Sequence, residues 1–146
     1  MQLDKRIIKK LIKPENIEQL IFELFDKKFR KQINPKDIYD VFKQKNYYMF
    51  SEFKDGKIVA MVSMYVMKLF SRKNAVIEEV VTLKEYRNNG LGSKLVKFAI
   101  EKAKELGCDC IELNVRRDKL EVKRFYEELG FKDRNNDAMR MLLKSG

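Results

Sequence analysis

A turn with two glycines, set between a strand-like and a helix-like segment, constrains the fold of this chain most. Residues 75–83 have the apolar content of a β-strand, and residues 92–106 repeat apolar side chains at helical spacing. The connecting residues 87–93 read RNNGLGS, and glycine permits close backbone approach and unusual φ angles. A helix N-terminus exposes unpaired N–H groups with a partial positive charge. The turn therefore predicts a cradle for an anion such as a pyrophosphate, with Arg87 as an added charged donor.

Two common phosphate-binding motifs fit this turn poorly. A P-loop requires Gly-Lys followed by Ser or Thr, whereas the order here is Gly92-Ser93-Lys94, and Arg87 occupies the position of the first glycine. A Rossmann fingerprint requires a third glycine where this chain has Leu95. It also belongs near the start of a parallel sheet, which the preceding segments do not suggest.

The periodicity of the whole chain predicts an α/β (α+β) domain with a mixed sheet. Six or seven strands and about four helices are expected. The expected strands cover residues 6–12, 47–54, 58–69, 75–83, 110–115 and 139–143, with one more at Phe131, and the expected helices cover residues 14–29, 35–45, 92–106 and 118–130.

Turn and cap residues separate these segments. Asp55-Gly56 is typical of a hairpin turn, which makes the strands on either side antiparallel. Gly107 suits the end of one helix. Asp118 and Glu121 resemble a capping box for the next helix. The sheet is therefore expected to contain an antiparallel meander.

The amino-acid composition excludes several kinds of catalytic site. The 146 residues, 45% of them hydrophobic, suit one ordinary domain with a core. The chain has no histidine, which excludes Ser-His-Asp triads and Cys-His pairs. Catalysis must then use carboxylates, Tyr, Lys, Cys or backbone groups. Cys108 and Cys110 are expected to be reduced structural thiols, and no metal site is expected.

The charge of +10 attracts anions, but it does not identify a partner. Lys and Arg are interleaved with Asp and Glu, and no block of five or six like charges occurs. No apolar run approaches the roughly 20 residues that span a bilayer. The N-terminal residues lack the apolar region of a signal peptide. We expect a cytoplasmic protein that does not contact membranes.

The pattern Arg-x-x-Gly-x-Gly after a strand resembles the GNAT superfamily of acetyltransferases. Residues 77–92, IEEVVTLKEYRNNGLG, are similar to motif A of that family over its whole length, and residues 124–131, RFYEELGF, are similar to motif B. The spacing of the motifs and the element order also fit, more weakly before residue 47. The resemblance implies the GNAT fold, with a mixed, mostly antiparallel sheet. It also implies one acetyl-CoA-dependent N-acetyltransferase domain over residues 1–146.

The resemblance assigns cofactor-binding roles to the strand, the turn and the second motif. The backbone of residues 80–83 would pair with the pantetheine arm, and residues 87–93 would hold the pyrophosphate. The thioester would lie where the strand over residues 75–83 separates from the strand over residues 110–115. The implied cofactor-binding residues are Val80, Val81, Thr82, Leu83, Arg87, Asn88, Asn89, Gly90, Leu91, Gly92, Ser93, Asn114, Lys119 and Tyr126.

The implied mechanism is direct attack of a neutral amine on the thioester in a ternary complex. Tyr126 matches the tyrosine that serves as general acid in the family, although packing in the core is its alternative role. Glu79 is the first choice for the base and Glu78 the second, and a water relay remains an alternative. Because neighbouring residues alternate across a strand, only one of the two carboxylates is expected to face the cleft.

Some residues depart from the family pattern. Lys119 stands where Asn is frequent, so that it would replace the cofactor contact of the Asn by a contact to a phosphate, and Val122 stands where Ala is frequent. Thr82 replaces an aliphatic residue and Lys84 replaces a proline. Since the expected contacts in that strand are made by the backbone, these last two changes leave its role intact.

The acceptor is expected to be a small primary amine, and the basic charge would suit a phosphorylated one. A protein N-terminus or a lysine side chain is an alternative acceptor. A non-catalytic acyl-CoA-binding or interaction module is an alternative function. A nucleic-acid binder is disfavoured because no recognition motif occurs. A homodimer stays open. For Tyr47, Tyr48 and Phe50, a place in the core is preferred to a place in the acceptor pocket.

Overall fold

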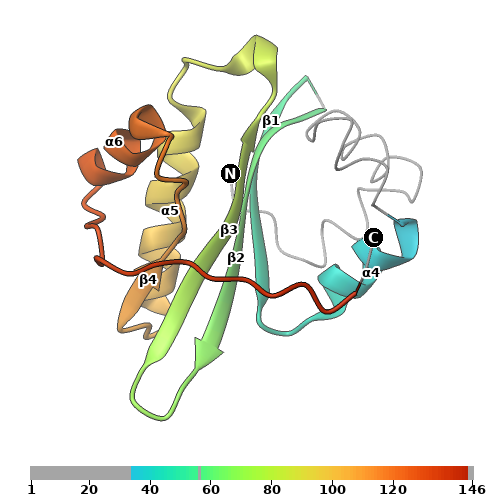
Figure 1. The fold of residues 1–146 in the computed structure, drawn as a ribbon. Coiled ribbons are helices and arrows are strands. Elements are labelled where there is room, and N and C mark those ends of the chain that lie inside the picture. The colour runs from blue at the N-terminus through green and yellow to red at the C-terminus, as the bar shows by residue number, and fades with distance from the viewer. Residues whose placement is uncertain (1–33, 56, 145–146) are drawn as a thin grey trace. The chain divides into compact units, whose positions relative to one another are not determined.

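The structure, a computed structural model, describes residues 34–55 and 57–144. They belong to two compact units, one ending at Leu113 and one beginning at Asn114. The elements of the first unit, in chain order (Figure 1), are α4 (Pro35–Lys43), β1 (Tyr47–Lys54), β2 (Lys57–Lys68), β3 (Lys73–Thr82), the 3-10 helix η1 (Lys84–Tyr86), α5 (Leu91–Glu105) and β4 (Cys110–Glu112). The second unit contains α6 (Leu120–Glu128). The predicted strand over residues 6–12 and the predicted helix over residues 14–29 lie outside the described residues.

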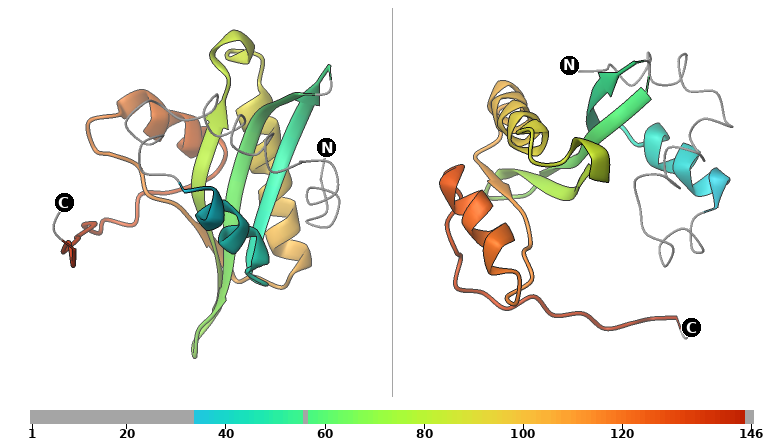
Figure 2. Two further views of the ribbon diagram at one scale, coloured as in Figure 1. Left: turned by 90° about the vertical axis from the view of Figure 1, so that its right-hand side faces the viewer. Right: turned by 90° about the horizontal axis from the view of Figure 1, so that it is seen from above.

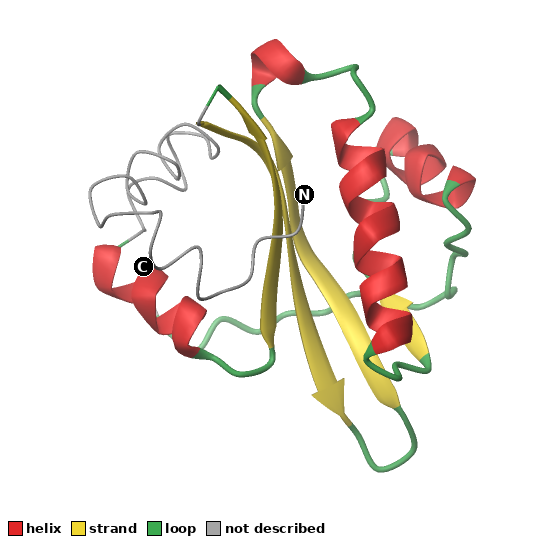
Figure 3. Ribbon diagram, turned by 180° about the vertical axis from the view of Figure 1, so that it is seen from behind, coloured by secondary structure: helices red, strands yellow, loops and turns green. Residues whose placement is uncertain are grey.

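The described strands form one mixed sheet in the order β1-β2-β3-β4. β1 with β2 and β2 with β3 are antiparallel pairs, whereas β3 and β4 are parallel. Lys54 pairs with Lys57 across the first turn, where Asp55 has a φ of 52°. β2 and β3 continue beyond the end of β1 as a hairpin (Figure 3). The predicted α/β class and the mostly antiparallel sheet are confirmed.

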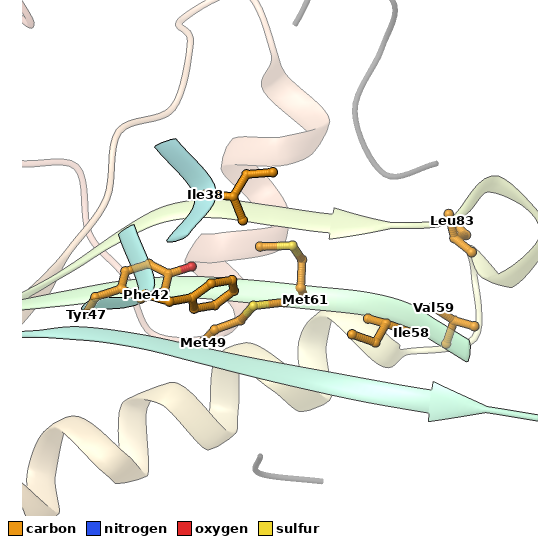
Figure 4. Close-up of a cluster of buried hydrophobic side chains, with 8 residues drawn as sticks. All are labelled: Ile38, Phe42, Tyr47, Met49, Ile58, Val59, Met61 and Leu83. Carbon is orange, nitrogen blue, oxygen red and sulfur yellow. The ribbon is translucent and has the colours of Figure 1, made fainter. Parts of the chain in front are cut away.

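Helices α4 and α5 cover opposite faces of this sheet (Figures 1 and 2). Asn34 caps α4, because its side-chain oxygen accepts a hydrogen bond from the Lys36 N–H at 3.0 Å. Eight buried side chains make the core on the α4 side (Figure 4): Ile38, Phe42, Tyr47, Met49, Ile58, Val59, Met61 and Leu83. This core holds the end of β3 against β2.

The α5 face of the sheet has a second apolar layer. Leu95, Val96 and Ala99 are almost fully buried. The rings of Phe50 on β1 and Phe98 on α5 meet edge to face, with centroids 5.2 Å apart. Gly107, with a φ of 76°, follows the last turn of α5 in the conformation that the sequence predicted for it. The middle of α5 is therefore packed against the sheet.

The second unit is built around α6. The ring of Tyr126 meets the rings of Phe125 and Phe131 edge to face, with centroid distances of 4.9 and 5.7 Å. Lys123 forms an ion pair with Asp133 at 2.8 Å. Helix α6 has Lys119 as its N-cap and no side-chain cap bond, so the predicted capping box of Asp118 and Glu121 is wrong. The carboxylate of Asp118 instead accepts a hydrogen bond from Arg116 at 3.0 Å.

Three predicted strands differ from the structure. The strand over residues 110–115 is shorter, because only Cys110–Glu112 pairs with β3. The predicted strands at Phe131 and over residues 139–143 are wrong, since no residue from 131 to 144 is in a strand. The apolar side chains of the second segment are exposed, as for Met139 at 93% and Leu143 at 90%. A strand requires a partner for its backbone groups, and this segment has none among the described residues.

Among the residues that the structure describes, no helix has both the length and the apolar character needed to cross a bilayer.

Candidate active site

The turn from β3 into α5 is held by its own side chains. The Leu83 N–H donates to the Val59 carbonyl at 2.9 Å and ends β3 on the core. Arg87 then reaches back, and its Nε donates to the Thr82 carbonyl at 3.1 Å. The side-chain amide of Asn89 donates to the carbonyls of Tyr86 and Arg87 at 3.2 and 3.3 Å. These bonds stabilise the turn.

The N-terminus of α5 is open to an anion. Its N-cap is Gly90, with φ 73° and ψ 11°, and no side chain caps the helix. No acidic residue lies in the first turn. The Lys94 N–H makes the first hydrogen bond of the helix, to the Gly90 carbonyl at 3.0 Å. The N–H groups of Leu91, Gly92 and Ser93 therefore have no acceptor within the helix, and no acidic residue of the first turn offsets the partial positive charge there.

Backbone conformation explains the residue types in the turn. Asn88 has a φ of 65°, and Gly90 also has a positive φ, a region that asparagine and glycine adopt most readily. A Cβ atom added at Gly90 would meet nothing within 4 Å, so the structure requires glycine there for its φ angle. The space beside Gly90 is left open at the helix N-terminus.

Strand β3 has an unpaired edge that leads to this turn. Its pairing with β4 covers three residues and ends at Val76 with Glu112. The two strands thus separate as predicted, and in the described part of the chain no strand borders the later residues of β3 on that side.

The direction of the backbone groups selects which residues of β3 can be used from this edge. The Leu83 N–H points to β2. Because the backbone N–H and C=O groups of successive residues point to opposite sides of a strand, those of Val81 point to β2 too. Val80 and Thr82 direct their backbone groups to the unpaired edge, where Arg87 already occupies the Thr82 carbonyl. Only two of the four predicted pantetheine-pairing residues therefore offer backbone groups to a ligand.

A β-bulge in β3 brings two carboxylates to the same face. Ser63 of β2 pairs with Glu79, but the next residue, Met64, pairs with Ile77, so Glu78 is the extra residue. Both Glu78 and Glu79 are exposed and line a cavity of about 340 Å³. The prediction that only one of them faces the cleft is wrong, because a bulge interrupts the alternation of a regular strand.

We call this cavity the acidic pocket, and its other described walls are apolar and aromatic. It is lined by Tyr65, Met67, Val76, Glu78 and Glu79. The Tyr65 hydroxyl accepts a hydrogen bond from the side-chain amide of Gln44 at 3.1 Å, which ties this wall to the end of α4. The ring of Tyr65 also lies 5.2 Å from that of Tyr47.

Behind the acidic pocket, polar side chains continue into the core. The Ser63 hydroxyl donates to Glu79 Oε2 at 2.8 Å, and the Tyr47 hydroxyl lies 2.8 Å from the same Ser63 oxygen. Tyr47 and Ser63 are only 3% and 1% exposed. Burial raises the pKa of the Tyr47 phenol well above its usual range. The expected place of Tyr47 and Phe50 in the core is confirmed, whereas Tyr48 is only half-buried.

The remaining predicted site residues lie in the second unit. Tyr126 is half-buried between its two aromatic neighbours, and burial raises the pKa of its phenol. Asn114 and Lys119 are exposed. The Lys119 backbone opens α6 by accepting a hydrogen bond from the Lys123 N–H at 3.0 Å. The roles of these three residues stay predictions.

The sequence reasoning missed the residues that surround the two carboxylates. Ser63, Tyr65, Met67 and Val76 were placed in strands and given no role in the site. One usable signal was Ser63, a polar residue within the apolar stretch AMVSMYVM of β2. A buried hydroxyl needs a hydrogen-bond partner, and here that partner is Glu79.

Comparison with known proteins identifies the family of this chain. The sequence matches the Acetyltransferase (GNAT) family over residues 18–131. It is 30% identical over 81 residues to an aminoalkylphosphonate N-acetyltransferase from Salmonella typhimurium, covering 54% of this chain and 53% of that protein. It is 35% identical over 83 residues to a glucosamine 6-phosphate N-acetyltransferase from Arabidopsis thaliana, covering 55% of this chain and 54% of that protein. The match thus spans about half the length of these curated relatives.

A solved structure gives a longer match. The crystal structure of a protein described as a transcriptional regulator from Bacillus halodurans C-125 superposes with a TM-score of 0.76. It is 30% identical, and the match covers 88% of this chain and 94% of that one. From the family match over most of its length, the strand-turn-helix geometry and this structural likeness, the chain is a member of the GNAT family.

Proposed function

We propose that this chain is an acetyl-CoA-dependent N-acetyltransferase whose acceptor is a small primary amine. One observation carries the proposal: within one compact unit, β3 runs from a pocket with two carboxylates, along an unpaired edge, to the turn before an uncapped helix N-terminus. Such a terminus suits the phosphates of a cofactor, and carboxylates suit an ammonium group. Membership of the GNAT family supports the same function.

The cosubstrate acetyl-CoA would supply an activated acetyl thioester. We expect the first-turn N–H groups of α5 to hold its pyrophosphate. The guanidinium of Arg87 is oriented by its bond to Thr82, which would leave its terminal nitrogens to an anion. The unpaired backbone groups of Val80 and the Thr82 N–H would pair with the pantetheine arm, in the manner of an added strand.

Three proton transfers accompany the proposed reaction. A carboxylate of the acidic pocket, Glu79 or Glu78, would remove a proton from the ammonium form of the acceptor, directly or through a water molecule. The neutral nitrogen then forms the bond to the acetyl carbon as the carbon–sulfur bond breaks, and it releases a second proton to the solvent as it becomes the amide. Tyr126 is the proposed donor of the proton to the leaving thiolate. Its phenol is protonated at neutral pH, as that role requires, and burial raises its pKa further from neutrality.

The acceptor class follows from size and charge. By their names, the two curated relatives act on an aminoalkylphosphonate and on glucosamine 6-phosphate, which are small amines with an anionic group. The net charge of +10 suits such an anionic group, and the carboxylates of the acidic pocket suit its ammonium end. We therefore propose a small amine and retain a protein N-terminus or lysine side chain as the alternative acceptor.

A thermal-denaturation assay tests the cofactor part of the proposal. Acetyl-CoA at 100 times its Kd adds about 2.7 kcal/mol of stability, a shift of about 5 to 10 °C for a chain of this size. ATP at the same concentration is the polyanion control. A shift with acetyl-CoA and none with ATP supports the cofactor site. Equal shifts, or no shift, would mean that the turn before α5 is not a coenzyme A site.

Release of free coenzyme A in the presence of amines tests the reaction. Glucosamine 6-phosphate and glucosamine form one matched pair, and 2-aminoethylphosphonate and 1,2-diaminoethane form another. Turnover with the phosphorus-bearing member of each pair supports an anionic small amine. Turnover only with a lysine peptide or a peptide N-terminus supports the alternative acceptor. Binding of acetyl-CoA without turnover of any amine supports a non-catalytic acyl-CoA-binding module.

A further inference from the structure

Three side chains form a hydrogen-bonded row from the core to the acidic pocket. Tyr47 on β1, Ser63 on β2 and Glu79 on β3 are joined by two oxygen–oxygen distances of 2.8 Å. Tyr47 packs among the apolar side chains of the α4-side core (Figure 4). Glu79, at the other end, lines the pocket and is exposed. Three neighbouring strands thus contribute one side chain each.

The hydrogen bonds of this row can have only one direction. An ionised carboxylate accepts hydrogen bonds and donates none, so the Ser63 proton must go to Glu79. A hydroxyl has a single proton, and Ser63 must therefore accept from Tyr47, whose phenol donates. Burial raises the Tyr47 pKa, which keeps that proton in place at neutral pH. The row is consequently a fixed donor directed at one oxygen of Glu79.

The second carboxylate of the acidic pocket has no such support. Among the described residues, no hydrogen bond or ion pair is made by the Glu78 side chain, which enters the pocket as the extra residue of the bulge. Glu79 Oε2 accepts the hydrogen bond from Ser63, and within the described residues Oε1 accepts none. A side chain held by a buried donor loses less freedom on reaction than a freely rotating one.

We propose that Tyr47 and Ser63 are positioning residues that hold Glu79, in preference to Glu78, as the base that accepts the proton of the amine. This inference rests on the N-acetyltransferase function proposed above. The proton moves from the ammonium nitrogen to Glu79 Oε1, while the bond from Ser63 to Oε2 remains and holds the carboxylate in place. Tyr47 acts through Ser63 and does not touch the substrate.

Ser63→Ala is the central variant, and Ser51→Ala is its matched control. Ser51 lies on β1, is 0% exposed, and its hydroxyl has no hydrogen-bond partner within the described residues. Both changes remove a buried strand hydroxyl, but only Ser63 contacts Glu79. We expect Ser63→Ala to lower kcat roughly tenfold or more, the usual effect of losing a hydrogen bond to a charged group. Ser51→Ala should leave kcat unchanged, and Ser63→Thr should restore most of the activity.

A double-mutant cycle separates positioning from general structural damage. Glu79→Gln should lower kcat roughly 100-fold or more. If Ser63 acts through Glu79, adding Ser63→Ala to Glu79→Gln should cause no further loss of kcat. The assay is coenzyme A release with the best amine of the panel above, with kcat, KM and the acetyl-CoA-induced Tm shift recorded for each variant. The acetyl-CoA-induced Tm shift should be equal in the wild type, the two single variants and the double variant.

Three outcomes would overturn the inference. Equal losses from Ser63→Ala in the wild-type and Glu79→Gln backgrounds would mean that Ser63 acts independently of Glu79. An unchanged kcat in Ser63→Ala would mean that the row has no role in the reaction. A larger kcat loss in Glu78→Gln than in Glu79→Gln would assign the base to the other carboxylate. Absence of turnover by the wild-type chain would overturn the proposed function together with this inference. The three outcomes above overturn only the inference, so the two failures are distinguishable.

Discussion

Replacement of Gly90 by alanine separates backbone strain from cofactor binding. Gly90 lies immediately before α5 and Gly107 lies two residues after its last residue, with φ angles of 73° and 76°. At both positions an added Cβ would meet nothing within 4 Å. The same substitution therefore introduces the same strain at both ends of one helix. Only the N-terminal end is proposed to hold the pyrophosphate.

The expected magnitudes follow from that geometry. A left-handed alanine costs about 1 to 2 kcal/mol relative to glycine. Each variant alone should thus lose about 2 to 8 °C in Tm. In Gly90→Ala, the new methyl group stands where the anion would approach, and a tenfold loss of affinity is the expected scale. At a fixed acetyl-CoA concentration of 100 wild-type Kd, the added stability would then fall from about 2.7 to about 1.4 kcal/mol.

Thermal denaturation with and without acetyl-CoA measures both the backbone strain and the loss of acetyl-CoA affinity in one experiment. Gly107→Ala should melt earlier than the wild type but keep the full acetyl-CoA shift. Gly90→Ala should melt as early as Gly107→Ala and show about half of the shift. If both variants keep the full shift, the open N-terminus of α5 does not hold the cofactor. If both lose it equally, general destabilisation explains the result, and the proposed pyrophosphate site is refuted.

Three further predictions concern the proposed acid, an ion pair and the core. Tyr126→Phe should lower kcat at least tenfold and leave the acetyl-CoA-induced Tm shift unchanged. Because burial raises the Tyr126 pKa, activity limited by this phenol should decline only above pH 10. A decline of kcat near pH 8 that disappears in Tyr126→Phe would contradict this assignment. Lys94 lies 2.7 Å from the Glu52 carboxylate and lowers the Glu52 pKa from its ordinary value of 4.5. The stability that this ion pair adds to the folded state should therefore be complete above pH 4.5 and be lost as the pH falls. Urea unfolding should therefore show a smaller acid-induced loss of stability in Glu52→Gln than in the wild type, and equal losses would exclude this contribution. Phe50→Ala should lower the free energy of unfolding by roughly 3 to 5 kcal/mol in the same assay, because the side chain is 1% exposed and packs on Phe98. Phe70→Ala, at an exposed turn, should leave the free energy of unfolding almost unchanged. Similar losses in the two variants would contradict the assignment of Phe50 to the core.

Local signals in the sequence were sufficient for the elements that position the site. β1 occupies the predicted residues 47–54, and α5 begins and ends within one residue of its predicted limits. The glycine turn, the hairpin at Asp55 and the positive φ of Gly107 were also predicted from residue types. These features depend on side chains a few positions apart, so an amphipathic repeat or a glycine is enough to specify them. The motifs around the turn likewise predicted the GNAT family.

Tertiary structure decided the strands whose pairing is not local. Residues 139–143 have the apolar content of a strand but pair with nothing in the described part of the chain. β4 is half as long as predicted, because β3 and β4 separate after Val76. A strand exists only where another backbone supplies its hydrogen bonds, and that partner is distant in the sequence.

The arrangement of the acidic pocket was also decided by tertiary structure. A one-residue bulge opposite Ser63 turned both Glu78 and Glu79 toward the same cavity, where regular alternation predicts only one. The register of β2 against β3 also placed Ser63 beside Glu79, and that of β1 against β2 brought Tyr47 to Ser63. The sequence alone determined that this chain has a strand, a glycine turn and a helix suited to an anionic cofactor. Strand register alone decided that Glu79 is the carboxylate held by Ser63. Register depends on the whole sheet and not on the residues of one strand.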